Sequence, residues 1–168
     1  WLVLWALGME PGELEAKAQR EVTDDEHARA AALVTQRIES RRPAAYLTHE
    51  AWLQNVPFYV DERTIVPRSF IAELLADAES EGTLDAWLSD RTRRVLDLCT
   101  GNASLAVIAA MAYPEIAVDA CDISQDALAV ARINVERHDL SARIALLQSD
   151  LFAGVRGPYD LIICNPPY

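Results

Sequence analysis

Apolar residues follow two different periods in the first half of the chain, and the first of them predicts a helix. Over residues 23–42, small and apolar side chains recur every three or four positions, which is the spacing of one helix face. Thr23 and Glu26 form the sequence of a capping box, in which each side chain accepts a hydrogen bond from the other residue's backbone. Pro43 cannot continue a helix. We therefore predict a helical segment that ends before Pro43.

The second period is that of β-strands. Between residues 51 and 66, aromatic and β-branched residues surround the turn-prone pair Gln54-Asn55, and this pattern predicts a β-hairpin. Ser69 precedes a short apolar pattern of helical spacing, so we expect it to cap a helix. The polar residues 79–94 that follow predict a linker.

After Arg93 the pattern alternates regularly between strand and helix. The predicted strands are 95–99, 117–120, 143–147 and 160–164, and the predicted helices are 105–111 and 125–138. Such alternation is typical of a parallel sheet. We therefore predict an α/β, Rossmann-like, doubly wound fold with four strands in this chain. Because the fourth strand would leave an open sheet edge, we expect further strands to belong to the same domain.

The composition and charge narrow the class of partner. Hydrophobic residues make up 51% of the 168 residues and charged residues 24%, which is the balance of a globular protein. The longest apolar run, residues 105–112, is too short for a membrane span. The net charge of −11 disfavours nucleic-acid binding, which needs clustered Lys and Arg. A basic protein partner fits this charge better.

The cysteines indicate a reduced, cytoplasmic protein. Cys99, Cys121 and Cys164 are odd in number and lack the close spacing of zinc or redox motifs. Each falls near the end of a predicted strand, where a free cysteine usually packs as a small hydrophobic residue. We expect neither a catalytic thiol nor a metal site.

A cofactor site is predicted at the carboxyl ends of the strands, where ligands of open α/β sheets bind. The first strand runs through Asp97 into Cys99-Thr100-Gly101-Asn102-Ala103, a turn of small residues before a helix. Asp122 ends the second strand, where a carboxylate can accept hydrogen bonds from both hydroxyls of a ribose. A dinucleotide fingerprint needs three glycines and only Gly101 is present, so a nicotinamide oxidoreductase is disfavoured. In the alternative interpretation, Asp122 caps a helix and Gly101 permits a turn.

The loops after the third and fourth strands complete the predicted site. Asp150 can accept a hydrogen bond from the amino group of adenine while Leu151 or Phe152 packs on the ring. The alternative is a helix-capping Asp150 with Phe152 in the core. The fourth strand leads into Asn165-Pro166-Pro167-Tyr168. The Asn165 amide can pair with a planar amide or amino group, the proline carbonyls lack competing donors, and Tyr168 offers a flat face. This loop predicts methylation of a planar nitrogen, for which positioning is the main requirement.

With these motifs, the chain resembles the protein glutamine methyltransferases. The segments Pro43-Ala-Ala-Tyr-Leu-Thr-His-Glu-Ala-Trp-Leu, Pro57-Phe-Tyr-Val-Asp-Glu-Arg and Val66-Pro-Arg-Ser-Phe-Ile-Ala-Glu-Leu are similar to the PrmB-type branch, which modifies a large-subunit ribosomal protein. The release-factor branch usually has proline and acidic residues where this chain has Ser69-Phe70. The resemblance implies S-adenosyl-L-methionine as cofactor and the side-chain amide of a glutamine in a basic ribosomal protein as substrate.

The resemblance also implies the roles of residues and the domain plan. It implies a helical substrate-recognition segment at 1–50, a hairpin and linker at 51–92 and the first half of a methyltransferase domain at 93–168. The residues implied to bind the cofactor are Asp97, Cys99, Thr100, Gly101, Asn102, Ala103, Asp122, Asp150, Leu151 and Asn165. The residues implied to hold the substrate amide are Asn165, Pro166, Pro167 and Tyr168.

One departure from the family pattern leaves other functions open. The family loop usually reads Thr-Gly-Ser-Gly, whereas this chain has Asn102-Ala103. A methyl group near the cofactor either weakens binding or, if it fits, has little effect, and we expect Ala103→Gly to strengthen binding. A scaffold that has lost its cofactor is therefore one alternative. The others are a release-factor glutamine methyltransferase and a nucleic-acid adenine methyltransferase, which uses the same Asn-Pro-Pro-Tyr chemistry but needs a basic groove.

Overall fold

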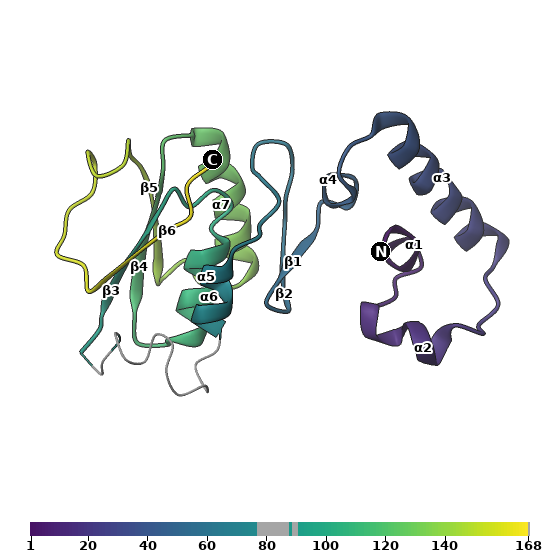
Figure 1. Ribbon diagram of the computed structural model, residues 1–168, viewed down its shortest axis with the longest axis horizontal. Coiled ribbons are helices and arrows are strands. Elements are labelled where there is room, and N and C mark those ends of the chain that lie inside the picture. Colours follow the sequence, from purple (N-terminus) through teal and green to yellow (C-terminus); the bar gives the residue numbers. More distant parts are fainter. Residues whose placement is uncertain (77–87, 89–90, 168) are drawn as a thin grey trace. The chain divides into compact units, whose positions relative to one another are not determined.

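The computed structural model describes residues 1–76, 88 and 91–167. The chain divides into two compact units, Trp1–Glu50 and Ala51–Tyr168 (Figure 1). Within the described residues, no helix is both long and apolar enough to cross a membrane. Most of the linker predicted at 79–94, and Tyr168, lie outside the described residues.

The first unit is helical. Its elements are α1 (Leu2–Ala6), the 3-10 helix η1 (Pro11–Glu13), α2 (Leu14–Lys17), α3 (Asp24–Ser40) and α4 (Ala44–Thr48). The helix predicted before Pro43 is confirmed as α3. Its capping box is formed, because the Glu26 amide donates to Thr23 Oγ1 at 3.3 Å and the Thr23 amide donates to the Glu26 carboxylate at 3.0 Å. Arg41 ends the helix in the left-handed conformation.

The second unit begins with a hairpin that is shorter than its sequence pattern predicts. Strands β1 (Ala51–Leu53) and β2 (Val56–Phe58) pair antiparallel around Gln54 and Asn55, which both have positive φ as this tight turn requires. Residues 59–69 form no strand. We call them the strap. Val60 is fully buried there. A buried hydrophobic residue of this kind gives the strap a strand-like sequence pattern, although the strap pairs with no strand in the described part of the chain.

The strap leads into a parallel sheet with its helices. Ser69 Oγ accepts a hydrogen bond from the Ile71 amide at 3.2 Å at the start of α5 (Phe70–Ala76). The remaining elements are β3 (Arg94–Leu98), α6 (Ser104–Ala112), β4 (Ala117–Asp122), α7 (Gln125–Arg137), β5 (Ile144–Gln148) and β6 (Leu161–Cys164). The four strands are parallel, in the order β5-β4-β3-β6. The predicted Rossmann-like α/β fold is confirmed, with element ends that differ from prediction by one or two residues.

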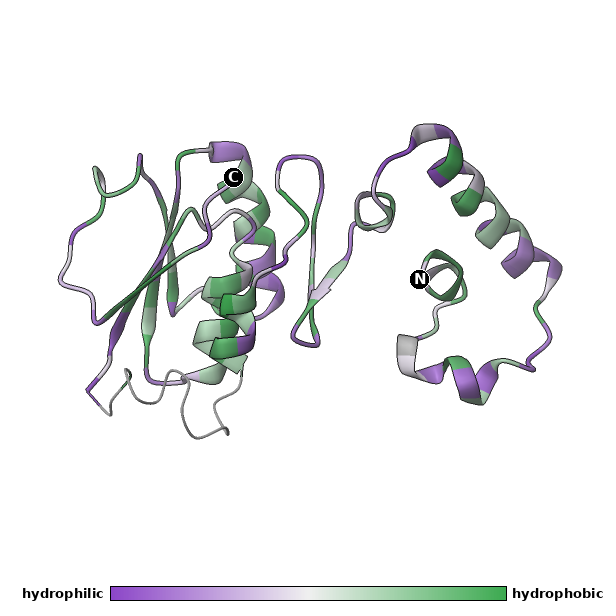
Figure 2. Ribbon diagram, in the orientation of Figure 1, coloured by the Kyte–Doolittle hydropathy of each residue, from purple (hydrophilic) through white to green (hydrophobic). Residues whose placement is uncertain are grey.

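The main core lies between this sheet and helices α5, α6 and α7, which cover one face (Figure 1). Helix α6 is mostly hydrophobic (Figure 2). Strand β3 and α6 are mostly buried, whereas β5 and β6 are partly exposed. On the opposite face, Leu96, Leu98 and Cys121 pack against Val155 and Tyr159 of the loop that precedes β6. From β3 the chain continues to β4 and β5 on one side and then returns to place β6 on the other side of β3. The carboxyl ends of β3, β4 and β6 therefore form a topological switch point.

Candidate functional site

A cavity of about 480 Å³ lies at the carboxyl ends of β3, β4 and β6, within the range of small-molecule sites. Its walls come from the strap (residues 63–69), the loop between β3 and α6, the start of α7, and the loops after β5 and β6. Most of the residues predicted for the site meet here. Those that line the cavity are Cys99, Thr100, Gly101, Asn102, Asp122, Asp150, Leu151, Asn165, Pro166 and Pro167. Asp97 and Ala103 are buried outside this lining.

Residues 99–103, which we call the cofactor loop, are held to the end of β4. The Thr100 amide donates to the Cys121 carbonyl at 2.9 Å, and the Gly101 amide donates to Asp122 Oδ2 at 2.9 Å. Gly101 has φ +57, a conformation that favours glycine. The backbone of the loop therefore lines the cavity, and the Gly101 hydrogen bond fixes its distance from Asp122.

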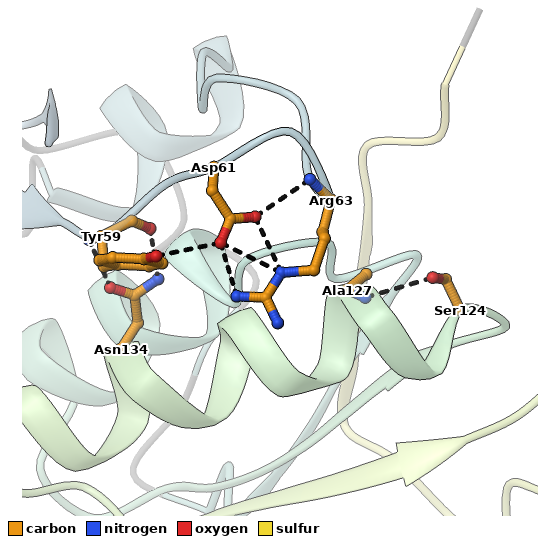
Figure 3. Close-up of polar contacts among 6 residues, drawn as sticks. All are labelled: Tyr59, Asp61, Arg63, Ser124, Ala127 and Asn134. Atoms are coloured by element: carbon orange, nitrogen blue, oxygen red, sulfur yellow. Dashed lines mark hydrogen bonds and ion pairs between the residues drawn. The ribbon is translucent and has the colours of Figure 1, made fainter. Parts of the chain in front are cut away.

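The Asp122 carboxylate helps to fix the start of α7 and also lines the cavity. Its Oδ1 accepts a hydrogen bond from the Ser124 amide at 3.0 Å, and Ser124 Oγ in turn caps α7 by accepting from the Ala127 amide at 3.2 Å (Figure 3). Each carboxylate oxygen can accept two hydrogen bonds, so one site on each oxygen remains for a ligand. The half-buried carboxylate lines the cavity beside Ile123 and Leu151, whose side chains are 63% and 53% exposed. Apolar side chains exposed in a cavity can pack on a flat ring.

Ala103 does not place its methyl group in the cavity. It adopts the left-handed conformation with φ 63, and its fully buried side chain belongs to the main core. Ala103 does not line the cavity, so the expected contact between its methyl group and a ligand is not formed there. The cost of Ala103 is conformational instead.

The structure therefore changes the expected effect of Ala103→Gly. Glycine relieves the positive φ but loses a buried methyl group, and these effects are each about 1 kcal/mol and opposite in sign. We expect the free energy of unfolding to change by less than about 1 kcal/mol and ligand affinity by less than about threefold. Chemical denaturation and calorimetry measure the two quantities. An affinity gain of about tenfold or more would show that the methyl group does obstruct the ligand.

Asp97 supports the cofactor loop from behind. Its side chain is 1% exposed, and its Oδ2 accepts hydrogen bonds from Thr100 Oγ1 at 2.5 Å and from the Ala106 amide at 3.2 Å. Burial raises the pKa of Asp97 to about 7, and the charge of Asp122 adds to this effect, while the two hydrogen bonds oppose it. Among the described residues, Oδ1 has no hydrogen-bond partner. Asp97 therefore shapes the loop without contacting the cavity.

The raised pKa of Asp97 makes folding stability depend on pH. The folded protein binds the proton more tightly than the unfolded chain, so the free energy of unfolding falls as pH rises from about 4 to about 7. Each pKa unit corresponds to about 1.4 kcal/mol, which gives an upper bound of about 4 kcal/mol for this loss. We expect Asp97→Asn to flatten this part of the profile, as measured by urea unfolding at several pH values. Equal slopes for both proteins would contradict the assignment.

The cysteines lie close to the cavity, and the thiols of two of them have raised pKa values. All three are free, at the ends of β3, β4 and β6. Burial raises the pKa of the Cys99 thiol to about 11, with a further contribution from Cys164, and burial also raises the pKa of Cys121. The reactive form of cysteine is the thiolate. The raised pKa values of Cys99 and Cys121 therefore disfavour the thiolate form at neutral pH.

Asn165 lies directly after β6 and lines the cavity. Its Nδ2 donates to the Arg68 carbonyl of the strap at 3.5 Å, a weak hydrogen bond. Among the described residues, its Oδ1 accepts none. This arrangement orients the amide of Asn165 while leaving an acceptor for a second amide or amino group. Pro166 and Pro167 are exposed beside it.

The methyltransferase small domain family matches residues 70–168, which contain the sheet, its helices and all of the predicted site residues. The chain belongs to the methyltransferase small domain family.

The chain is similar over its whole length to curated proteins named ribosomal protein uL3 glutamine methyltransferase. It is 44% identical to the one from Neisseria gonorrhoeae and 47% identical to the one from Bradyrhizobium diazoefficiens. The alignments cover 100% of this chain, but only 55% and 54% of those two proteins. The chain thus spans about half the length of these relatives. The resemblance to the protein glutamine methyltransferases is confirmed.

Solved structures agree on the fold. A SAM-dependent methyltransferase from Agrobacterium tumefaciens matches 70% of this chain and 39% of its own, with a TM-score of 0.53 and 21% identity. The delta-N METTL16 MTase domain matches 86% of this chain and 60% of its own, with a TM-score of 0.53 and 18% identity. At these identities the likeness concerns the fold alone.

The residues of the methyltransferase cavity fit an adenosine-containing methyl donor. Asp122 offers a charged acceptor for ribose hydroxyls, Ile123 and Leu151 offer apolar faces for the base, and the loop at Thr100 and Gly101 offers backbone close to the ligand. No clustered phosphate-binding glycines accompany them. This set suits a nucleoside joined to a small tail better than a pyrophosphate.

The sequence interpretation missed two parts of the site. The strap supplies one wall of the cavity, from Arg63 to Ser69, although the hydrophobic pattern assigned most of it to a hairpin. Asn134, on α7, is fully buried and bonds both to the strap and to the cofactor loop. A fully buried amide on a helix is unusual. Helical spacing from the apolar residues Val130 and Ala131 places Asn134 on the buried face of α7, but the sequence does not identify its hydrogen-bond partners.

Proposed function

We propose that the protein transfers a methyl group from S-adenosyl-L-methionine to the side-chain amide nitrogen of a glutamine in a large-subunit ribosomal protein. The observation that carries the proposal is one cavity lined both by Asp122, beside the cofactor loop, and by the amide of Asn165. The names of the curated relatives, at 44–47% identity, support the choice of substrate.

The cofactor would be held by residues at the carboxyl ends of β3, β4 and β5. The Asp122 carboxylate accepts hydrogen bonds from the ribose, Ile123 and Leu151 pack on the adenine, and Asp150 is placed to accept from its amino group. The cofactor loop supplies close backbone. When bound, the cofactor supplies an electrophilic methyl group. No metal or thiol is needed for this transfer.

The substrate amide would be positioned by the loop after β6. Asn165 Oδ1 accepts a hydrogen bond from the substrate nitrogen, while Nδ2 is held by the Arg68 carbonyl. The carbonyls of Pro166 and Pro167 add acceptors whose residues carry no competing backbone donor. Tyr168, outside the described residues, keeps its role as a stacking face only as a prediction from sequence. Positioning matters because an amide nitrogen is a weak nucleophile.

Charge supports a protein substrate over a nucleic acid. The chain has 15 Lys and Arg against 26 Asp and Glu, so its field attracts a basic partner and repels phosphates. Ribosomal proteins that bind RNA are such partners. We propose that the modification takes place in the cytoplasm, before or during assembly of the large subunit.

Partition of a labelled methyl group tests the proposal. Purified protein is incubated with methyl-labelled S-adenosyl-L-methionine and a ribosomal extract, and label is counted in separated protein and nucleic-acid fractions. We expect label in a basic large-subunit protein and none in nucleic acid. Label in adenine of added DNA, with unlabelled protein, would instead support a nucleic-acid adenine methyltransferase.

A further inference from the structure

Two irregular segments, far apart in the sequence, both line the cavity. The strap contributes residues 63–69 and the cofactor loop contributes Cys99, Thr100, Gly101 and Asn102. Neither segment belongs to a helix or strand, so no ladder of backbone hydrogen bonds fixes their separation. Other contacts must therefore set the distance between the two segments. That distance determines the width of the cavity.

One side chain bonds to both segments. Asn134, on α7, is 0% exposed and makes three hydrogen bonds. Its Oδ1 accepts from the Tyr59 amide at 2.7 Å, and its Nδ2 donates to the Tyr59 carbonyl at 3.0 Å and to the Asn102 carbonyl at 2.9 Å. Figure 3 shows the pair of bonds that the Asn134 amide forms with Tyr59, at the start of the strap.

The contact with Tyr59 is transmitted along the strap to the cavity. The Tyr59 hydroxyl donates to Asp61 Oδ2 at 3.0 Å, and the Arg63 guanidinium donates to both oxygens of the same carboxylate (Figure 3). The Arg63 guanidinium holds the pKa of Asp61 at about 2, so this bridge stays charged at neutral pH. Arg63 is the first strap residue that lines the cavity. The path from Asn134 to the cavity wall therefore consists of short polar contacts.

The contact with Asn102 reaches the cofactor loop directly. Asn102 is buried, and its Oδ1 accepts from the Ser104 amide at 3.2 Å, which fixes the turn into α6. The Asn134 bond then fixes the carbonyl of the same residue. The next residue, Ala103, has positive φ, a conformation that costs about 1 kcal/mol in a non-glycine residue and needs support from its surroundings.

We infer that Asn134 is a positioning residue for the methyl donor: it holds the cofactor loop and the strap at the separation that the cofactor requires. This inference rests on the proposed function. A buried amide with three backbone partners is well suited to the role, because each lost bond leaves a buried group unpaired. Asn134 lies outside the cavity lining, and its effect on the cofactor is transmitted through Asn102 and Tyr59.

The chain offers a matched control on the same helix. His138 lies four residues after Asn134, and its Nε2 is 2.9 Å from the Pro57 carbonyl of the hairpin. Its ring also packs against Phe58, with centroids 5.4 Å apart. His138 thus joins α7 to the hairpin, but it has no contact with the cofactor loop among the described residues. A role limited to stabilising the fold would be shared by both residues.

The test compares Asn134→Asp with His138→Ala in the purified protein. Asn134→Asp keeps the acceptor for the Tyr59 amide but loses the donors to both carbonyls. Calorimetry measures affinity for S-adenosyl-L-methionine, and thermal melts measure the stability of each variant. We expect Asn134→Asp to lower affinity at least tenfold and His138→Ala to lower it less than about twofold, at temperatures well below both melting points.

Equal affinities for the two variants would overturn the inference. If the unmodified protein bound no cofactor, the proposed function would fail first, and the two failures are therefore distinct. Hydrogen exchange of the unmodified protein provides a second measurement that does not depend on folding of Asn134→Asp. Saturating cofactor should slow exchange of the Tyr59 amide, which is bonded to Asn134 Oδ1. Slowed exchange in the cofactor loop with an unchanged Tyr59 amide would also overturn the inference.

Discussion

Replacement of Asn165 by alanine is expected to lower the rate of methyl transfer by on the order of a hundredfold or more, while cofactor affinity stays within about threefold. Asn165 faces the cavity, and its Nδ2 contacts the strap carbonyl of Arg68 rather than the cofactor loop. Its loss therefore removes orientation of the acceptor nitrogen. Single-turnover kinetics with saturating cofactor measure the rate, and calorimetry measures the affinity.

Gln148→Ala is the matched control for this variant. Gln148 also carries an amide at the end of a strand, but it bonds to Gln125 and to the Ile123 carbonyl and does not line the cavity. We expect its transfer rate to remain within about twofold of the unmodified protein. Similar losses in both variants would mean that Asn165 supports the fold of the sheet edge and does not position the substrate.

The second large effect is expected for Asp122→Ala, which should lower cofactor affinity by about a hundredfold or more. Two ribose hydroxyls would lose a charged acceptor, at about 1.5 to 3 kcal/mol for each bond. The same carboxylate also accepts from the Gly101 and Ser124 amides, so the cofactor loop would lose an anchor in addition. Both consequences act in the same direction. Isothermal calorimetry with S-adenosyl-L-methionine measures the loss.

Asp119→Ala is the matched control for Asp122→Ala, because it also removes a carboxylate from β4. Asp119 lies in the same strand, where it accepts hydrogen bonds from Arg94 at 2.8 Å and from the Tyr159 hydroxyl at 2.6 Å, away from the cavity. We expect this variant to be less stable but to bind cofactor within about threefold of the unmodified protein. Normal affinity in Asp122→Ala would remove the ribose assignment.

The features that could be predicted from the sequence are those that depend on local patterns. Alternation of apolar strands and helices after Arg93 predicted the parallel sheet, and the rule that ligands bind at the carboxyl ends of strands brought Asp122 and Asn165 together. The capping box at Thr23 was predicted because all of its partners lie within three residues.

The features that could not be predicted depend on contacts between distant segments. Asn134 is separated from Tyr59 by 75 residues and from Asn102 by 32, and its partners are backbone groups, which have no sequence signature. Val60 is buried although it does not pair with a strand, so its hydrophobicity predicted a longer hairpin than the structure contains. The direction of the Ala103 methyl group depends on its positive φ, which a single sequence does not reveal.

Site-resolved mass spectrometry of the product tests the central claim most directly. The purified protein is incubated with S-adenosyl-L-methionine and a purified large-subunit ribosomal protein of the kind named in its relatives, and the product is mapped by peptide fragmentation. We predict the added mass of one methyl group on a glutamine side chain, and no modification when that glutamine is replaced by glutamate. A methyl group on another residue type, or unchanged labelling of the glutamate variant, would contradict the account.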